Sequence, residues 1–162
     1  MKKEEKTNAL RLLDARNVIH QVHVYDPDAA DGMEVAQLLG EAADRVFKTL
    51  VTVSASRHYY VFVVPVNATL HLKKAASAVG EKSIAMLPQK ELLPLTGYIH
   101  GGCSPVGMKK LFPTFIHETA QLFDTIFVSA GRRGCQMELS PDTLCELIGA
   151  KYADLTEEKC KE

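Results

Sequence analysis

The stretch of sequence that decides the fold is residues 46–66, VFKTLVTVSASRHYYVFVVPV. Its two ends, residues 46–53 and 59–66, are rich in β-branched and aromatic side chains, which favour β-strands. Residues 54–57 between them are small or polar and predict a turn. We therefore expect a hairpin at the centre of a sheet, with a second strand apolar enough to be buried on both faces.

Helices and further strands are expected before and after this hairpin in the sequence. Short polar side chains start several of the predicted helices, because their oxygens can accept a hydrogen bond from the first helical turn. Glycines mark three of the helix ends. The predicted helices begin at Thr7, run from Asp31 to Gly40, from Asn67 to Gly80 and from Ser140 to Gly149, and follow Pro88 around Leu92 and Leu93. Further strands are predicted at residues 19–25, 113–116, 125–129, 136–139 and, at a sheet edge, 151–155.

The order of these elements predicts the fold class. Strands and helices are interleaved, but without the regular strand–helix–strand rhythm of a parallel sheet. We therefore predict an α/β protein of the α+β type, in which helices surround a mixed, strongly curved β-sheet or partial barrel. The 162 residues and the 46% hydrophobic fraction are ordinary for a globular protein, so a single domain is expected over residues 1–162.

The sequence also argues against several locations and partners. It contains no run of about 18 apolar residues and no apolar segment after the charged N-terminus, so a cytoplasmic protein without a membrane partner is expected. A net charge of −1 argues against bulk electrostatic binding to nucleic acid, and no DNA partner is expected. Three basic pairs still allow contacts with a few phosphates: Lys73-Lys74, Lys109-Lys110 and Arg132-Arg133.

The four cysteines are too scattered for a disulfide framework or a zinc site, since the chain has no CxxC motif. We expect free thiols, no metal and no cofactor. The cysteines are Cys103, Cys135, Cys145 and Cys160.

Two glycine-rich loops are candidates for binding a ligand. Residues 97–110, GYIHGGCSPVGMKK, place adjacent glycines beside small and basic residues. Glycine lets another molecule approach bare backbone N–H groups, which suits an anionic or carbonyl oxygen. The second loop, residues 130–134 (AGRRG), follows a predicted strand and could fold beside the first.

Two side chains stand out in these elements. Lys48 lies in an apolar strand, so it is either an outward-facing surface lysine or a cation directed at a ligand phosphate or oxyanion, and the sequence leaves both open. Cys103 lies near His100, but a nucleophilic thiol needs a base or a positive field. A small apolar side chain on a loop is the favoured interpretation of Cys103.

Five motifs then occur in a consistent order along the chain. They are VFKTLV at 46–51, LKK at 72–74 with Gly80, TGY through GGCSPVGMKK at 96–110, FPT at 112–114 and VSAGRRG at 128–134. Together they resemble the YbaK family of aminoacyl-tRNA editing proteins, specifically its Cys-tRNA(Pro) deacylase branch, over residues 7–156. In many bacteria the same domain is inserted in prolyl-tRNA synthetase.

The resemblance implies cleavage of the ester between a mischarged amino acid, chiefly cysteine, and the terminal ribose of a tRNA. Lys48 matches the hallmark catalytic lysine, which meets the phosphate of the terminal adenosine or polarises the site. Gly101 matches a residue that offers its backbone to the substrate. The other substrate-binding residues that the resemblance implies are Tyr25, Thr49, Gly102, Ser104 and Ser129.

The same resemblance implies a substrate-assisted mechanism. The cysteine thiol of the substrate attacks its own carbonyl and leaves as a cyclic thioester, while the protein supplies position and charge stabilisation. Serine and alanine esters lack the thiol and would be spared. The chain departs from the family at Gln136, where relatives frequently carry aspartate, and glutamine can form hydrogen bonds but cannot act as a base.

The implied partners are the aminoacyl-tRNA, Cys-tRNA(Pro) and possibly Cys-tRNA(Cys), and prolyl-tRNA synthetase. Three alternatives stay open at this point. The chain could be an Ala-tRNA(Pro) deacylase like the related ProX branch, a non-catalytic module that binds tRNA or a synthetase, or a thiol hydrolase that uses Cys103.

Overall fold

The computed structural model describes residues 6–28 and 31–157. Its strands form a five-stranded sheet, in the order β4-β2-β3-β5-β8, and a three-stranded sheet, in the order β1-β7-β6. The strands are β1 (Gln21–Val24), β2 (Phe47–Ser54), β3 (Tyr59–Pro65), β4 (Ile84–Met86), β5 (Thr114–His117), β6 (Ile126–Arg132), β7 (Cys135–Leu139) and β8 (Lys151–Ala153). The helices are α1 (Asn8–Ala15), α2 (Gly32–Leu39), α3 (Leu72–Val79), α4 (Leu92–Thr96) and α5 (Pro141–Ile148). Short 3-10 turns are η1 (Ala43–Arg45), η2 (Gln89–Glu91) and η3 (Glu118–Leu122).

The predicted hairpin is confirmed. Strands β2 and β3 pair in antiparallel register from Phe47↔Pro65 to Val53↔Tyr59, at the centre of the larger sheet. The last five residues of β3 are buried, as its apolar sequence predicts. Parallel pairing of β3 with β5 and of β5 with β8 makes the sheet mixed, so the predicted fold class is confirmed as well. The single curved sheet of the prediction is divided into two.

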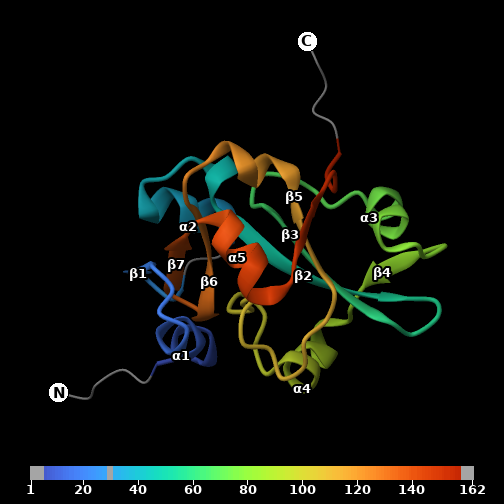
Figure 1. Cartoon of the computed structure of the whole chain (residues 1–162), viewed down its shortest axis with the longest axis horizontal. Helices are drawn as coiled ribbons and strands as arrows, with labels where there is room; N and C mark the ends of the chain where they lie inside the picture. The colour runs from blue at the N-terminus through green and yellow to red at the C-terminus, as the bar shows by residue number, and fades with distance from the viewer. Residues whose placement is uncertain (1–5, 29–30, 158–162) are drawn as a thin grey trace, which may run out of the picture.

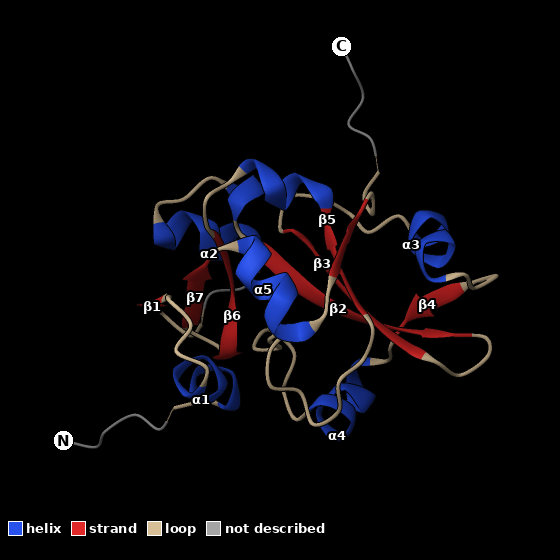
Figure 2. Ribbon diagram, viewed as in Figure 1, coloured by secondary structure: helices blue, strands red, loops and turns tan. Residues whose placement is uncertain are grey.

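Helices cover these sheets and enclose the core (Figure 1). The largest core cluster joins α1 and α5 to the inner faces of β6 and β7, with Leu13, Leu144, Ile126 and Met137 among its members. At the other end of the molecule, α3 lies beside β4 (Figure 2). No helix in the described ranges is long and apolar enough to cross a membrane.

The two sheets are joined at one parallel bridge, Val46↔Phe127, located just before β2 and inside β6. Further along the same edge of β2, the edge that faces away from β3, residues Thr52 to Ser54 pair with β4. Between these points no strand pairs with that edge of residues 47–50, within the part of the chain that the structure describes. Pairing between the two sheets is therefore absent at Lys48 and Thr49.

Helix caps follow the sequence closely. The side chains of Thr7, Asp31 and Ser140 each accept a hydrogen bond from the first turn of α1, α2 and α5. Gly40 and Gly149 end their helices with left-handed backbone. These local signals were sufficient because a cap needs only residues three or four positions apart.

The predicted start of α3 is wrong. Helix α3 begins at Leu72 with His71 as its N-cap, whereas the sequence suggested Asn67. Residues between Asn67 and Leu72 pair with the C-terminal segment instead. Leu70 forms a β-bridge with Thr156, and the His71 N–H donates to Leu155 O at 2.8 Å. This long-range pairing overrides helix propensity. Strand β4 has only three residues and was not predicted.

Candidate active site

Two of the predicted site residues, Tyr25 and Ser129, lie with Gln136 on the outer face of the three-stranded sheet. In the central strand β7, Gln136 pairs with His23 on one side and with Ser129 on the other. Its Nε2 donates a hydrogen bond to the hydroxyl of Tyr25 at 3.2 Å. The neighbouring Met137 belongs to the core under α1 and α5, so the alternation of the strand directs Gln136 to the opposite face.

Lys48 lies on this outer face too. Val46 and Phe127 are bridged and pack in one apolar cluster beneath α2. Lys48 and Ser129 each follow this bridge by two residues, and side chains two residues apart in a strand point the same way. The bridge thus brings the predicted catalytic lysine toward Ser129 from the other sheet.

The ammonium of Lys48 has no counterion among the residues that the structure describes. The residue is half-buried, and it forms no hydrogen bond or ion pair within the described ranges. Burial lowers the pKa of Lys48, because an apolar environment disfavours the charged form. A strand lysine whose head group was free in water would show no such effect. Of the two interpretations of Lys48, the structure therefore favours a cation that binds an anionic ligand over an outward-facing surface lysine.

Thr49 shares the gap between the sheets with Lys48 but belongs to the other face of β2. Its neighbours at alternate positions, Phe47 and Val51, are buried in core clusters. The Oγ1 atom of Thr49 is buried and has no hydrogen-bond partner in the described structure. The two adjacent polar residues therefore present a cation on one side of the strand and an unpaired hydroxyl on the other.

The two glycine-rich loops lie against each other. A Cβ atom added at Gly102 would come within 2.9 Å of Arg132 Cα and 3.0 Å of its carbonyl carbon, so the backbones touch. Arg133 Nε donates to His100 O at 3.1 Å and crosses the surface of Gly101, which has a φ of +86°. The predicted contact between the loops is confirmed, and it attaches the first loop to the turn that follows Ser129.

Ser104 and Cys103 are buried in the first loop. The Ser104 hydroxyl accepts a hydrogen bond from Val106 N at 3.2 Å, which shapes the turn around the following proline. Its role in substrate binding stays a prediction. Burial raises the pKa of the Cys103 thiol to about 12, so the thiol stays protonated at neutral pH. This observation favours the apolar interpretation of Cys103. Cys145 is a free thiol as predicted, and Cys160 lies outside the described residues.

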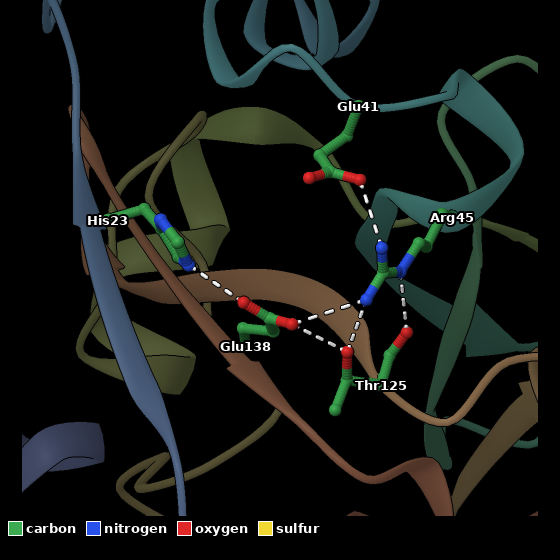
Figure 3. A network of polar contacts seen from close by, with 5 residues as sticks. All are labelled: His23, Glu41, Arg45, Thr125 and Glu138. Carbon is green, nitrogen blue, oxygen red and sulfur yellow. Dashed lines mark hydrogen bonds and ion pairs between the residues drawn. The ribbon is translucent and has the colours of Figure 1, made fainter.

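A polar network that no sequence pattern indicated borders the same face (Figure 3). Glu138 lies between a histidine and an arginine: His23 Nε2 is 2.9 Å from Oε1, and Arg45 Nη2 is 3.2 Å from Oε2. Thr125 Oγ1 donates to Oε2 at 2.6 Å, and Glu41 accepts from Arg45 Nη1 at 3.0 Å. Hydrogen bonding from Thr125, followed by His23, lowers the pKa of Glu138.

This network holds the elements that carry the site. It connects β1, which leads to Tyr25, with η1, which leads to Lys48, and with the central strand β7. The guanidinium of Arg45 also lies 5.2 Å from the ring centre of Phe127, the residue at the bridge between the sheets. Its members are far apart in the sequence, so no spacing pattern could have revealed them.

A hollow of about 220 Å³ lies elsewhere, between α1, the loop at 105–112 and α5. Part of the first glycine loop lines this hollow, but none of the predicted site residues does. We therefore place the candidate active site at the parting of the two sheets.

Residues 26–147 match the family of aminoacyl-tRNA editing domains. The chain belongs to this family. The matched region of the editing domain includes Lys48, both glycine loops and Gln136.

Named relatives of this editing domain agree with the match. A protein of Enterococcus faecalis, provisionally named Cys-tRNA(Pro)/Cys-tRNA(Cys) deacylase EbsC, is 44% identical over 157 residues, which is 96% of each chain. The proline–tRNA ligase of Shouchella clausii is 30% identical over 108 residues, which is 67% of this chain and 19% of the ligase.

A solved structure confirms the fold of the editing domain. It is described as a proposed trans-editing enzyme for prolyl-tRNA synthetase, and it superposes with a TM-score of 0.84 at 27% identity. The superposition covers 96% of this chain and all of the other.

Proposed function

We propose that the chain is a trans-editing deacylase that cleaves the aminoacyl ester of Cys-tRNA(Pro) and also accepts Cys-tRNA(Cys). The observation that carries the proposal is the unpaired, half-buried ammonium of Lys48 at the parting of the sheets. A half-buried cation without a counterion in the described structure is suited to a ligand that brings its own negative charge. The 44% identity to a relative provisionally named for this activity, over nearly the whole of both chains, supports the choice of substrate.

The proposed reaction uses the thiol of the substrate. The sulfur attacks the carbonyl carbon of its own ester, so that a C–S bond forms and the C–O bond to the ribose breaks. The thiol proton passes to the departing ribose oxygen, and the products are uncharged tRNA and a cyclic thioester. Lys48 would stabilise the terminal phosphate or the developing oxyanion, and the backbone of Gly101 would bind a substrate oxygen.

A protein nucleophile is not required in this scheme. The buried Cys103 thiol has a raised pKa and so cannot supply a thiolate at neutral pH. The proposed roles of Tyr25, Gly102, Ser104 and Ser129 are to shape the pocket around the aminoacyl group. Thr49 lies on the opposite face of β2 from Lys48 and is not part of this proposal. Positioning the thiol against the carbonyl is then the main source of rate, since intramolecular attack gains greatly from a fixed geometry.

The proposed partner and location follow from the substrate. With a net charge of −1, the chain has too little positive charge to select a tRNA by itself, so prolyl-tRNA synthetase is proposed to deliver the tRNA. The similarity of part of a proline–tRNA ligase to this chain is consistent with such a pairing. We place the protein in the cytoplasm, where tRNA is charged, and propose that residues 1–162 act as one editing domain.

The test is deacylation of tRNA(Pro) charged with cysteine, alanine or proline by the purified protein. We expect rapid loss of cysteine only, with a cyclic thioester detected by mass spectrometry as the first product. Turnover of the alanine ester at a similar rate would identify an Ala-tRNA(Pro) deacylase. Binding of Cys-tRNA(Pro) without any turnover would show a non-catalytic module.

A further inference from the structure

The candidate site contains a buried acceptor with no partner. Gln136 is 6% exposed, and its Oε1 atom receives no hydrogen bond in the described structure. Buried polar atoms are nearly always hydrogen-bonded, because leaving one unpaired costs its full desolvation. An orphaned amide oxygen on the same sheet face as Lys48 therefore indicates where a donor from another molecule binds.

The amide of Gln136 is anchored by its strand and by one hydrogen bond. Its strand is the central one of three, paired on both sides, so the backbone is fixed. Its Nε2 donates to the hydroxyl of Tyr25 at 3.2 Å. An amide has donors only on nitrogen and an acceptor only on oxygen, so this bond leaves Oε1 as a positioned acceptor.

The substrate of the proposed function supplies a matching donor, and the inference rests on that function. An aminoacyl ester carries its α-amino group on the carbon atom next to the reacting carbonyl. Lys48 repels a positive charge, so the amino group needs an acceptor away from the lysine. We propose that Gln136 Oε1 accepts a hydrogen bond from the α-amino group of the bound ester, and that Tyr25 positions the amide.

A neutral acceptor has a chemical consequence at this subsite. A carboxylate would favour the ammonium form and raise the pKa of the amine. The amide accepts from the amine in either protonation state. Selectivity then depends on the presence of an N–H group, and a site built to bind one discriminates strongly against an analogue that lacks it.

The experiment compares two thiol esters of tRNA(Pro). One carries cysteine and the other 3-mercaptopropionate, which keeps the thiol and lacks the amino group. Each enzymatic kcat/KM is divided by the spontaneous rate of the same ester, because the ammonium itself activates the carbonyl. The proteins are the unmodified chain, Gln136→Met, Gln136→Glu and Tyr25→Phe. Gln121→Met, at an exposed position in η3, is the control.

The unmodified chain should prefer the cysteinyl ester by about 10-fold to 100-fold, the range for one hydrogen bond to a charged group. Gln136→Met should abolish this preference by slowing the cysteinyl ester alone. Gln136→Glu, which keeps an acceptor, should retain it, and Tyr25→Phe should weaken it. Gln121→Met should change neither rate.

Two results would overturn the inference. Gln136→Met could keep the preference, or it could slow both esters equally, which would be a purely structural effect. Gln136→Glu guards against misfolding, since it retains the size of the side chain. Failure of the proposed function looks different: the unmodified chain would then not accelerate loss of cysteine from tRNA(Pro) at all.

Discussion

Lys48 and Ser129 each follow, by two residues, the Val46↔Phe127 bridge that joins the two sheets. A cation from one sheet is thereby set beside a hydroxyl from the other, although the residues lie in different halves of the chain. Within the described residues, strand pairing between the two sheets stops at the bridge, so the side chains beyond it do not belong to one continuous sheet. The position of the candidate site follows from where pairing ends.

Lys48 is expected to lower stability while it supports activity. Its pKa is lowered by burial, so the folded state holds this proton less tightly than the unfolded state. The side chain therefore destabilises the fold at neutral pH, and the penalty declines as pH rises through the lowered pKa. Lys48→Met should raise stability by about 1 kcal/mol and reduce kcat/KM for Cys-tRNA(Pro) at least about 100-fold. Lys48→Ala should abolish deacylation in a folded protein.

Denaturant unfolding and single-turnover deacylation measure the two effects of Lys48→Met. Lys151→Met is the matched control, because Lys151 is an exposed lysine on the edge strand β8. Full activity of Lys48→Ala would refute the catalytic role.

Gly102→Ala should separate the two loops. The added Cβ would meet the backbone of Arg132 at 2.9 Å, and a backbone cannot rotate away as a side chain can. We expect a loss of about 1–3 kcal/mol in stability and a marked fall in deacylation. At Gly40 a Cβ meets nothing, but φ is +70°, so Gly40→Ala should cost about 1 kcal/mol with activity kept. Equal activity of the two variants would argue against a role for the loop contact.

Glu138 should stabilise the protein above acidic pH. Its pKa is lowered, first by the hydrogen bond from Thr125, so the folded state favours the carboxylate. The contribution is present above the unfolded value near 4.5 and is lost as pH falls through the lowered pKa. Glu138→Gln should therefore reduce stability by about 1–3 kcal/mol at pH 7 and flatten its decline in acid.

Urea unfolding between pH 3 and 7 tests the role of Glu138, with Glu146→Gln on the exposed side of α5 as the control. An unchanged acid limb in Glu138→Gln would show that the network in Figure 3 contributes little.

His117 should make the fold sensitive to mild acid. It is buried, its Nδ1 accepts from Leu155 N at 3.1 Å, and its Nε2 lies 3.2 Å from Thr156 Oγ1. Burial lowers its pKa from the ordinary 6.5. Stability is then complete above pH 6.5 and declines as pH falls from there through the lowered pKa. Thermal unfolding from pH 5 to 8 should show this decline, and His117→Gln should remove it, whereas His100→Asn, at an exposed site, should not.

Cys103 should be dispensable for the reaction. A buried thiol with a pKa of about 12 does not form a thiolate at neutral pH. Cys103→Ser should keep deacylation within about 3-fold, because oxyanion and phosphate contacts are untouched. Loss of activity in a folded Cys103→Ser variant would instead support a thiol hydrolase. Labelling of native protein with iodoacetamide provides a second readout, and Cys103 should resist it.

Much of the fold was predictable because its causes are local. The hairpin at β2 and β3 follows from runs of β-branched residues, and three helix starts follow from a single polar side chain each. The start of α3 was not predictable, because His71 is held by Leu155 from the far end of the chain. In the site, Lys48 was visible as an anomaly, but its lack of a counterion depends on which strand lies next to β2. The contacts of Glu138 with His23 and Arg45 depend wholly on tertiary structure.

The single bridge between the sheets also bears on how editing domains diverge. Within the described residues, strand pairing between the two sheets ends at Val46 and Phe127, so the packing of Phe127 against its neighbours influences how far apart the sheets lie beyond this point. Substitutions in that apolar cluster under α2 would widen or narrow the opening without altering any residue that meets the ester. We therefore expect that substitutions in this apolar cluster, which does not contact the substrate, can change the amino acid preference of an editing domain. An alignment restricted to catalytic positions would not include these residues.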